Sequence, residues 1–113
     1  MKRRSPCPIA CSLDVFGDRW TLVVVRDLFA GKQHYHEFAA SPEGIATNIL
    51  ADRLGKLVKA GLVAATKSEA RVGSLAYSLT PKGRALYPVL EAVAAWGLAN
   101  VKGTRALIRV PRS

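Results

Sequence analysis

Residues 45–62 read IATNILADRLGKLVKAGL and carry the clearest helical pattern in the chain. Their large apolar side chains recur at the spacing that gathers them on one face of an α-helix. The opposite face carries the polar and charged residues, namely Thr47, Asn48, Asp52, Arg53, Lys56 and Lys59. Gly61 stands where a left-handed residue ends a helix, so the pattern predicts one amphipathic helix over residues 45–62.

The elements predicted before this helix are three shorter helices, at residues 8–16, 19–29 and 34–40. The run LVVV at 22–25 would also suit a strand, because β-branched residues favour that state. We favour a helix there because Asp18 can cap its start and Gly31 can stop it. The third helix ends at Ser41-Pro42, since the residue before a proline avoids the helical region.

The hydrophobic period changes after residue 62. Residues 63–67 and 75–79 both alternate between apolar and polar side chains, which predicts a β-hairpin with a loop of several residues. Thr80-Pro81 then starts the last helix, with threonine as N-cap and proline at the first position. Pro88 should kink this helix or divide it, and we expect it to end near Gly103.

The chain has 113 residues and a formal net charge of +9, from 17 Lys and Arg against 8 Asp and Glu. Half of the residues are hydrophobic, which excludes disorder for most of the chain and supports one domain, expected over 1–103 with a basic tail over 104–113. No apolar run approaches the roughly 20 residues of a membrane helix, and no secretory signal follows the basic start, so we expect a cytoplasmic protein. The positive charge suits nucleic acid, an anionic membrane surface or an acidic protein.

The order of the elements predicts a mainly α fold with a β-hairpin, the winged helix-turn-helix. The helices at 34–40 and 45–62 would form the helix-turn-helix, and the hairpin would be the wing. A major groove about 12 Å wide admits one helix whose side chains reach base edges. We therefore expect double-stranded DNA as partner, with no membrane partner, and contacts from Thr47, Asn48, Ala51, Arg53, Lys56, Lys67 and Arg71.

Two of these residues have specific candidate roles. Asn48 is a candidate adenine reader, and Arg53 is a candidate guanine or phosphate contact. Arg53 could instead pair with Glu37 or Asp52 and serve the structure, and the whole polar face could be an ordinary solvated helix surface. Asp52 would repel phosphate, so we expect it to point away from DNA or to hold a neighbouring side chain.

Between Cys7 and about Val101 the chain carries a series of short blocks, which include CP at 7–8, LDVFG at 13–17, RWTL at 19–22, LADRL at 50–54, LVKAGLV at 57–63 and YSLTPKG at 77–83. Together they resemble the HxlR-type transcriptional regulators, winged-helix proteins related to the MarR type. The resemblance implies a homodimeric DNA-binding repressor or activator with dimer contacts from the first and last helices, for which Leu13, Val93 and Trp96 are the candidates. Such a dimer would read a pseudo-palindromic operator, with its recognition helices about 34 Å apart.

The chain departs from the family pattern at three places. His34-Tyr35 stands where the family usually has Arg-Phe, and Ala46 stands where it has Ser. The wing run VGSLAY at 72–77 lacks the family's arginine, for which Arg71 could substitute. Without the serine, the cap of the recognition helix moves to Thr47 or is missing.

The resemblance also matches Cys7 to a cysteine that senses redox state or electrophiles in some members, with an oxidant or a small molecule as effector. Cys7 lies at a predicted helix start with Lys2, Arg3 and Arg4 just upstream, and both features favour a reactive thiolate. The alternative is a small buried hydrophobe, which is the role we expect for Cys11. A disulfide between Cys7 and Cys11 within one helix would be strained, which favours an intersubunit bridge or alkylation of Cys7.

Two other classes of function remain open to test. A winged-helix protein-interaction adaptor without DNA binding is the alternative, and the altered wing and Asp52 favour it. An enzyme is not expected, because the sequence has no paired carboxylates, no nucleophile-base set and no glycine-rich phosphate loop. His34 and His36 have no further ligands at metal-binding spacing, so we expect neither a metal nor another cofactor. We expect both histidines at the surface or in contact with phosphate. Trp20 and Trp96 are expected to anchor the core or a dimer interface.

Overall fold

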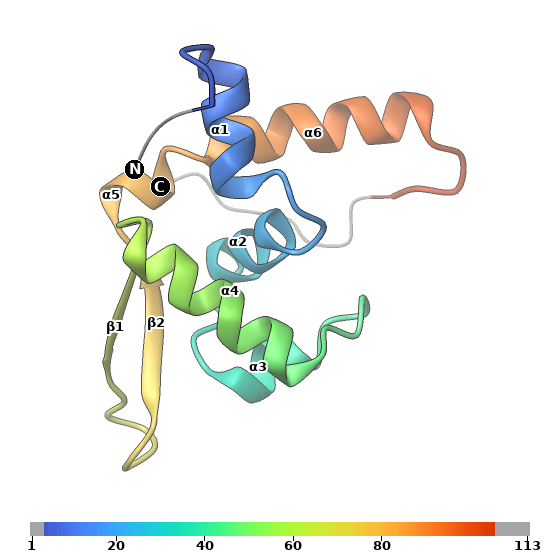
Figure 1. Cartoon of the computed structure of the whole chain (residues 1–113). Helices are drawn as coiled ribbons and strands as arrows, with labels where there is room; N and C mark the ends of the chain where they lie inside the picture. Colours follow the sequence, from blue (N-terminus) through green and yellow to red (C-terminus); the bar gives the residue numbers. More distant parts are fainter. Residues whose placement is uncertain (1–3, 106–113) are drawn as a thin grey trace.

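The computed structural model describes residues 4–105 and shows a mainly helical chain with one β-hairpin (Figure 1). In chain order the elements are α1 (Pro8–Phe16), α2 (Thr21–Phe29), α3 (Tyr35–Ala39), α4 (Thr47–Lys59), β1 (Val63–Lys67), β2 (Leu75–Leu79), α5 (Pro81–Arg84) and α6 (Tyr87–Asn100). The two strands pair antiparallel, with Val63 opposite Leu79 and Lys67 opposite Leu75. The predicted fold class, a mainly α winged helix-turn-helix with a hairpin wing, is confirmed.

One hydrophobic core joins α2, α3, α4 and the base of the hairpin. Leu50, Leu54 and Leu57 of α4 are at most 2% exposed and belong to the same cluster as Val25 of α2 and Phe38 of α3. The three leucines form one stripe along α4, so their burial turns the opposite side of the helix outward. In Figure 1, α3 and α4 lie below α2, whereas α1 and α6 lie above it.

The helix bounds differ from the prediction at α4 and at the last helix. The helix α4 occupies 47–59 rather than 45–62, because Ala46 has extended backbone and offers no side chain to cap it. Gly61 has a φ of +79°, as predicted for the residue that reverses the chain after this helix. Pro88 lies in the first turn of α6, so the last helix is divided there and begins anew. Of the predicted basic tail, residues 106–113 lie outside the described part of the chain.

Asp18 caps α2 and also reaches α4. Its Oδ2 accepts the backbone N–H groups of Trp20 at 3.0 Å and Thr21 at 3.2 Å, so α2 begins two residues later than predicted. The same oxygen lies 2.7 Å from Nε of Arg53, which joins the start of α2 to the middle of α4. Partial burial disfavours the carboxylate, but hydrogen bonds from Thr21, Arg53 and the Trp20 backbone outweigh it and hold the pKa of Asp18 well below its ordinary value.

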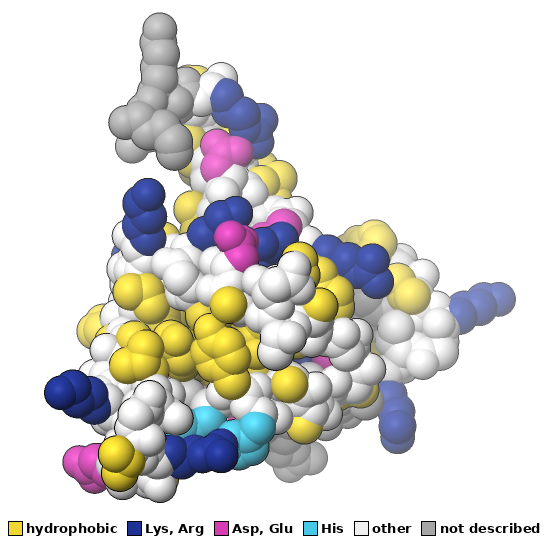
Figure 2. Space-filling view, turned by 60° about the horizontal axis from the view of Figure 1, so that its bottom comes forward, with side chains coloured by type: hydrophobic (Ala, Val, Ile, Leu, Met, Phe, Trp, Pro, Cys, Tyr) yellow, Lys and Arg dark blue, Asp and Glu magenta, His cyan; other side chains and the backbone are white. Residues whose placement is uncertain are grey.

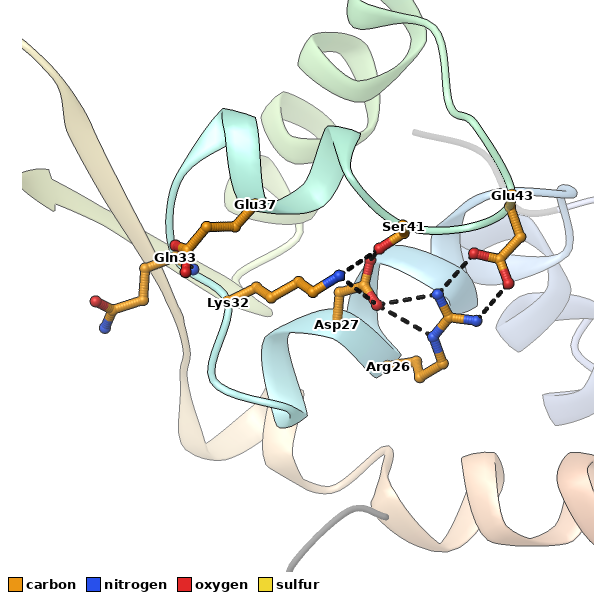
Figure 3. Close-up of polar contacts among 7 residues, drawn as sticks. All are labelled: Arg26, Asp27, Lys32, Gln33, Glu37, Ser41 and Glu43. Atoms are coloured by element: carbon orange, nitrogen blue, oxygen red, sulfur yellow. Dashed lines mark hydrogen bonds and ion pairs between the residues drawn. The ribbon is translucent and has the colours of Figure 1, made fainter. Parts of the chain in front are cut away.

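A buried ionic network, drawn in Figure 3, ties the end of α2 to the turn between α3 and α4. The Asp27 side chain is 2% exposed and accepts hydrogen bonds from Nε of Arg26 at 3.1 Å and from the Ser41 hydroxyl. Arg26 also donates to Glu43 at 2.7 and 2.8 Å, and Lys32 donates to Ser41. The hydrogen bonds to Glu43 raise the pKa of Arg26, and those same bonds lower the pKa of Glu43. The network therefore fixes the turn that orients α4.

Asp27→Asn should lower the free energy of unfolding by about 1–3 kcal/mol, because it removes the buried charge that Arg26 and Lys32 share, although Arg26 keeps its bonds to Glu43. Urea unfolding followed by far-UV circular dichroism measures this loss. Asp14→Asn is the matched control, since it breaks the exposed ion pair between Arg4 and Asp14 and should cost less than about 1 kcal/mol. Equal losses in the two variants would contradict a stabilising role for the network.

The stability difference between the wild type and Asp18→Asn should depend on pH. Because the folded-state pKa of Asp18 is depressed, its charge contributes stability that is fully present above the unfolded-state pKa, near about 4. That contribution is lost as the pH falls below this value toward the depressed pKa. Urea unfolding from about pH 7 to about pH 2.5 should therefore show a gap between the two proteins that narrows only below about pH 4. A gap of constant size over the whole range would rule out this linkage.

Candidate nucleic-acid interface

The outward side of α4 presents three small exposed side chains, Thr47, Asn48 and Ala51. All three lie away from the leucine stripe that faces the core. Short side chains let a helix backbone approach base edges closely in a major groove. The Asn48 amide can form two hydrogen bonds with an adenine, and the methyl groups of Thr47 and Ala51 suit contact with a thymine methyl.

Arg53 is held by contacts within the domain rather than presented outward. Its side chain is 20% exposed, its Nε donates to Asp18 at 2.7 Å, and its Nη1 donates to Asp52. The hydrogen bond to Asp18 raises the pKa of Arg53. Of the two roles that the sequence left open, the geometry supports the structural one, with Asp18 as partner in place of Glu37. Glu37 instead accepts backbone N–H groups just ahead of α3.

Asp52 holds neighbouring side chains, as the sequence predicted. One of its oxygens lies 3.3 Å from Nζ of Lys56, and the Lys56 side chain stays 70% exposed. The hydrogen bond from Lys56 lowers the pKa of Asp52. A single exposed ion pair contributes little, so Lys56 can leave it for a DNA phosphate. Arg53 would first have to leave its contacts with both Asp18 and Asp52.

The wing carries two predicted contact residues, Lys67 at the end of β1 and Arg71 in the loop that follows, and both are exposed. The loop is tied to α3 by two contacts between side chains. Arg71 Nη1 lies 2.7 Å from His36 Nδ1, and His34 Nε2 lies 2.9 Å from Ser68 Oγ. The sequence predicted surface or phosphate-contact histidines and gave no sign of these contacts, because the partners are 35 and 34 residues apart in the chain.

Figure 2 looks onto the side of the molecule that carries the wing and α3. Hydrophobic side chains gather across the middle of this face, and Lys and Arg side chains lie around them. The histidines lie at one edge, next to a cationic side chain. In a DNA duplex, phosphates lie on both sides of a groove and the base edges lie at its bottom. A surface with cations around a less polar centre suits this arrangement.

The two helices expected to form a dimer interface are uncovered in the single chain. Neither α1 nor α6 contributes a buried residue. The three candidates expose large fractions of their surface, 49% for Leu13, 54% for Val93 and 66% for Trp96. Trp20, in contrast, packs against the core.

The two cysteines have different surroundings. Cys7 is exposed and forms the N-cap of α1, whereas Cys11 is half-buried and its thiol lies 3.1 Å from the Ser5 carbonyl oxygen. Arg4 donates to Asp14 at 2.7 Å, and Lys2 and Arg3 lie outside the described residues. Within residues 4–105, no three side chains of His, Cys, Asp or Glu meet in a way that could hold a metal ion. No helix in this part of the chain has the length and apolarity needed to cross a membrane.

Known proteins share this arrangement. The model of the HxlR-like helix-turn-helix family matches residues 15–105. YvaP of Bacillus subtilis strain 168, an uncharacterised HTH-type transcriptional regulator, is 30% identical over 97 residues, which cover 85% of this chain and 90% of YvaP. The crystal structure of PA1607, a candidate transcription factor, is 41% identical with a TM-score of 0.82, over 94% of this chain and 74% of PA1607. The reduced form of the redox regulator HypR is 29% identical with a TM-score of 0.76, over 85% of this chain and 95% of HypR.

The matched family model is a helix-turn-helix family, and YvaP and PA1607 are described as a transcriptional regulator and a candidate transcription factor. The chain therefore belongs to the HxlR-like helix-turn-helix family of transcriptional regulators.

Proposed function

We propose that this regulator binds a specific DNA sequence as a homodimer, with α4 of each protomer in a major groove and the wing against the backbone. The observation that carries the proposal is the outward side of α4, where Thr47, Asn48 and Ala51 are exposed on a helix whose other side is fixed in the core. The cytoplasm is the expected compartment, because it holds the DNA of the bacteria in which such relatives occur. The side chains that we assign to phosphates are Lys56, Lys67 and Arg71.

The homodimer is proposed because α1 and α6 leave apolar side chains uncovered. The 14 residues of α6 include none that is buried, and an isolated helix of this length is only marginally stable in water. Exposed apolar surface of this kind marks an interface. A second copy of the chain is the occupant we assign, since a twofold dimer would place two recognition helices about 34 Å apart and read a pseudo-palindrome.

Selection of genomic fragments bound by the full chain tests this function. We expect the recovered fragments to share a pseudo-palindromic site, with an affinity that falls steeply as salt is raised because phosphate contacts release counterions. A folded dimer that recovers no fragment would contradict DNA binding and would favour the adaptor function instead.

Asn48→Ala should weaken binding to the selected operator by about 1–3 kcal/mol and relax the preference at one base pair, because a direct base contact is lost. Lys67→Ala is the matched control, expected to weaken binding to all sequences alike and to reduce the salt slope by about 1. Fluorescence anisotropy on operator variants over a salt series measures both effects. A uniform loss in Asn48→Ala would show that this residue does not read a base.

Trp96→Glu should convert the dimer to a monomer, because it would place an unpaired charge in the proposed interface. Sedimentation velocity measures the change in mass. Val72→Glu is the control, since Val72 is fully exposed on the wing and its replacement should leave the chain dimeric. A dimeric Trp96→Glu protein would contradict the assignment of α6 to the interface.

We further propose that oxidation or alkylation of Cys7 changes DNA binding. Cys7 is exposed at the start of α1, a helix that we assign to the dimer interface, whereas Cys11 is half-buried beside the Ser5 carbonyl. HypR, one of the similar solved proteins, is described as a redox regulator in both reduced and oxidised forms. In a twofold dimer, two Cys7 thiols could give two protons and two electrons to an oxidant such as a disulfide compound and form one intersubunit disulfide.

Diamide should therefore change the operator affinity of the wild type and of Cys11→Ser, but not that of Cys7→Ser. Non-reducing electrophoresis detects a covalent dimer, and mass spectrometry after iodoacetamide treatment shows which thiol reacts. The Cys7 assignment is overturned if Cys7→Ser responds to diamide as strongly as the wild type.

A further inference from the structure

A hollow of about 310 Å³ lies between α3 and the wing. The side chains around it that bear on its chemistry are His34, Tyr35, His36, Arg71, Ser74 and Tyr77. Within residues 4–105, neither His36 nor Arg71 forms an ion pair with a carboxylate. In this part of the chain, the Arg71 guanidinium and the His36 imidazole therefore line the hollow without a carboxylate partner.

The contact between Arg71 and His36 fixes the protonation of His36 in the free protein. Arg71 Nη1 lies 2.7 Å from His36 Nδ1, and a guanidinium can only donate a hydrogen bond. His36 Nδ1 must therefore accept it, so the ring is neutral and carries its proton on Nε2. Protonation at Nδ1 would break this contact and place two cations side by side.

His34 stands next to His36 and is bound differently. Its Nδ1 lies 3.1 Å from Glu37 Oε1, and its Nε2 lies 2.9 Å from Ser68 Oγ, so both ring nitrogens can donate to an oxygen. The His34 and His36 rings stack with their centroids 5.9 Å apart. The charged and titratable groups around His36 include His34 just before α3, Tyr35 and Glu37 of α3, and Arg71 of the wing loop.

Two tyrosines complete the wall of the hollow. The Tyr35 and Tyr77 rings lie 6.0 Å apart, and burial together with a hydrogen bond to Tyr35 raises the pKa of Tyr77. A tyrosine hydroxyl can donate a hydrogen bond to an anion, and so can the Arg71 guanidinium on the same wall.

We propose that this hollow binds one phosphate of the DNA backbone, and that His36 takes up a proton at Nδ1 when the phosphate enters. The proposal rests on the DNA-binding function proposed above. A phosphate accepts hydrogen bonds from a guanidinium more strongly than a neutral imidazole does. Arg71 exchanges its bond to His36 for bonds to the phosphate, and the freed Nδ1 binds a proton from solvent and donates it to the same phosphate. The anion then separates two charges that would otherwise repel each other.

Uptake of a proton links the affinity for DNA to pH. The hydrogen bond from Arg71 to Nδ1 requires a neutral His36 ring in the free protein, whereas the proposed contact with a phosphate requires a protonated one. If binding takes up one proton, operator affinity at constant ionic strength should rise by up to about tenfold for each unit that the pH is lowered from about 8 toward 6.5.

His36→Asn tests the linkage, because asparagine can accept the Arg71 hydrogen bond but cannot take up a proton. We expect operator affinity to rise on acidification for the wild type and to be nearly independent of pH for His36→Asn. Asn48→Ala is the matched control, since it should weaken binding but keep the wild-type dependence on pH. Titration calorimetry in buffers of different ionisation enthalpy counts the protons directly, and urea unfolding checks that His36→Asn is folded.

The source of the phosphate is tested with operators in which single backbone phosphates are replaced by neutral methylphosphonates. One replacement per half-site should abolish the pH dependence in the wild type and have no such effect in His36→Asn. If no replacement does so, and inorganic phosphate at fixed ionic strength abolishes the dependence instead, the hollow binds free phosphate and the assignment to the backbone is wrong.

The two proposals fail in distinguishable ways. Sequence-specific binding whose affinity does not change with pH, or changes equally in His36→Asn, overturns the phosphate site and leaves the DNA-binding function intact. Absence of DNA binding by a folded dimer overturns both.

Discussion

Burial of Leu50, Leu54 and Leu57 is the constraint on which the DNA-binding surface depends. These side chains lie on one stripe of α4, and only one rotation of the helix about its axis buries all three together. The side chains that remain outside, Asn48 and Ala51 among them, are therefore set by what the core removes from the surface. The contacts that fold the domain therefore also choose which side of α4 faces outward.

Burial alone chooses a side of a helix but leaves its exact angle free, because the hydrophobic effect has no direction. Polar contacts remove that freedom. Asp18 joins the start of α2 to α4 through Arg53, and Asp27 joins the end of α2 to the turn before α4 through Ser41. Both ends of α2 thus hold α4. Arg53 is a cation on α4, but its side chain is used in a contact within the domain and not in a DNA groove.

Local patterns predicted the elements well, and distant partners could not be predicted. The hairpin strands and the Thr80 cap follow from alternation and from residue type within a few positions, and the structure has them where expected. Ile45 shows the limit of periodicity, because it is buried in the core although its backbone precedes α4. Arg53 contacts Asp52, one of the two partners predicted from the sequence, but its ion pair with Asp18 joins residues 35 apart and could not be predicted.

The candidate site has two parts, the outward side of α4 and the contact between α3 and the wing loop. They differ in how far the sequence alone predicts them. Which residues of α4 face outward follows from the phase of the helix, so Thr47 and Asn48 could be named in advance. The contact of His36 with Arg71 depends on how the wing loop folds back onto α3, and the loop has no periodic pattern from which that could be derived. Side chains that share one face of a single helix can therefore be predicted from the sequence. A contact between side chains of two distant elements can be found only from the folded structure.

The cysteine and the recognition helix are connected by a short contiguous path through the fold. Cys7 begins α1, and α1 ends at Gly17, whose N–H donates to the Leu13 carbonyl at 2.7 Å and where a side chain would collide with that carbonyl. The next residue is Asp18, which holds Arg53 of α4. A hollow of about 330 Å³, lined by residues of α1, α2 and α4, leaves space beside this junction. Under the proposed Cys7 switch, a change in how α1 packs would reach α4 through this junction, because Asp18 directly follows Gly17 and holds Arg53.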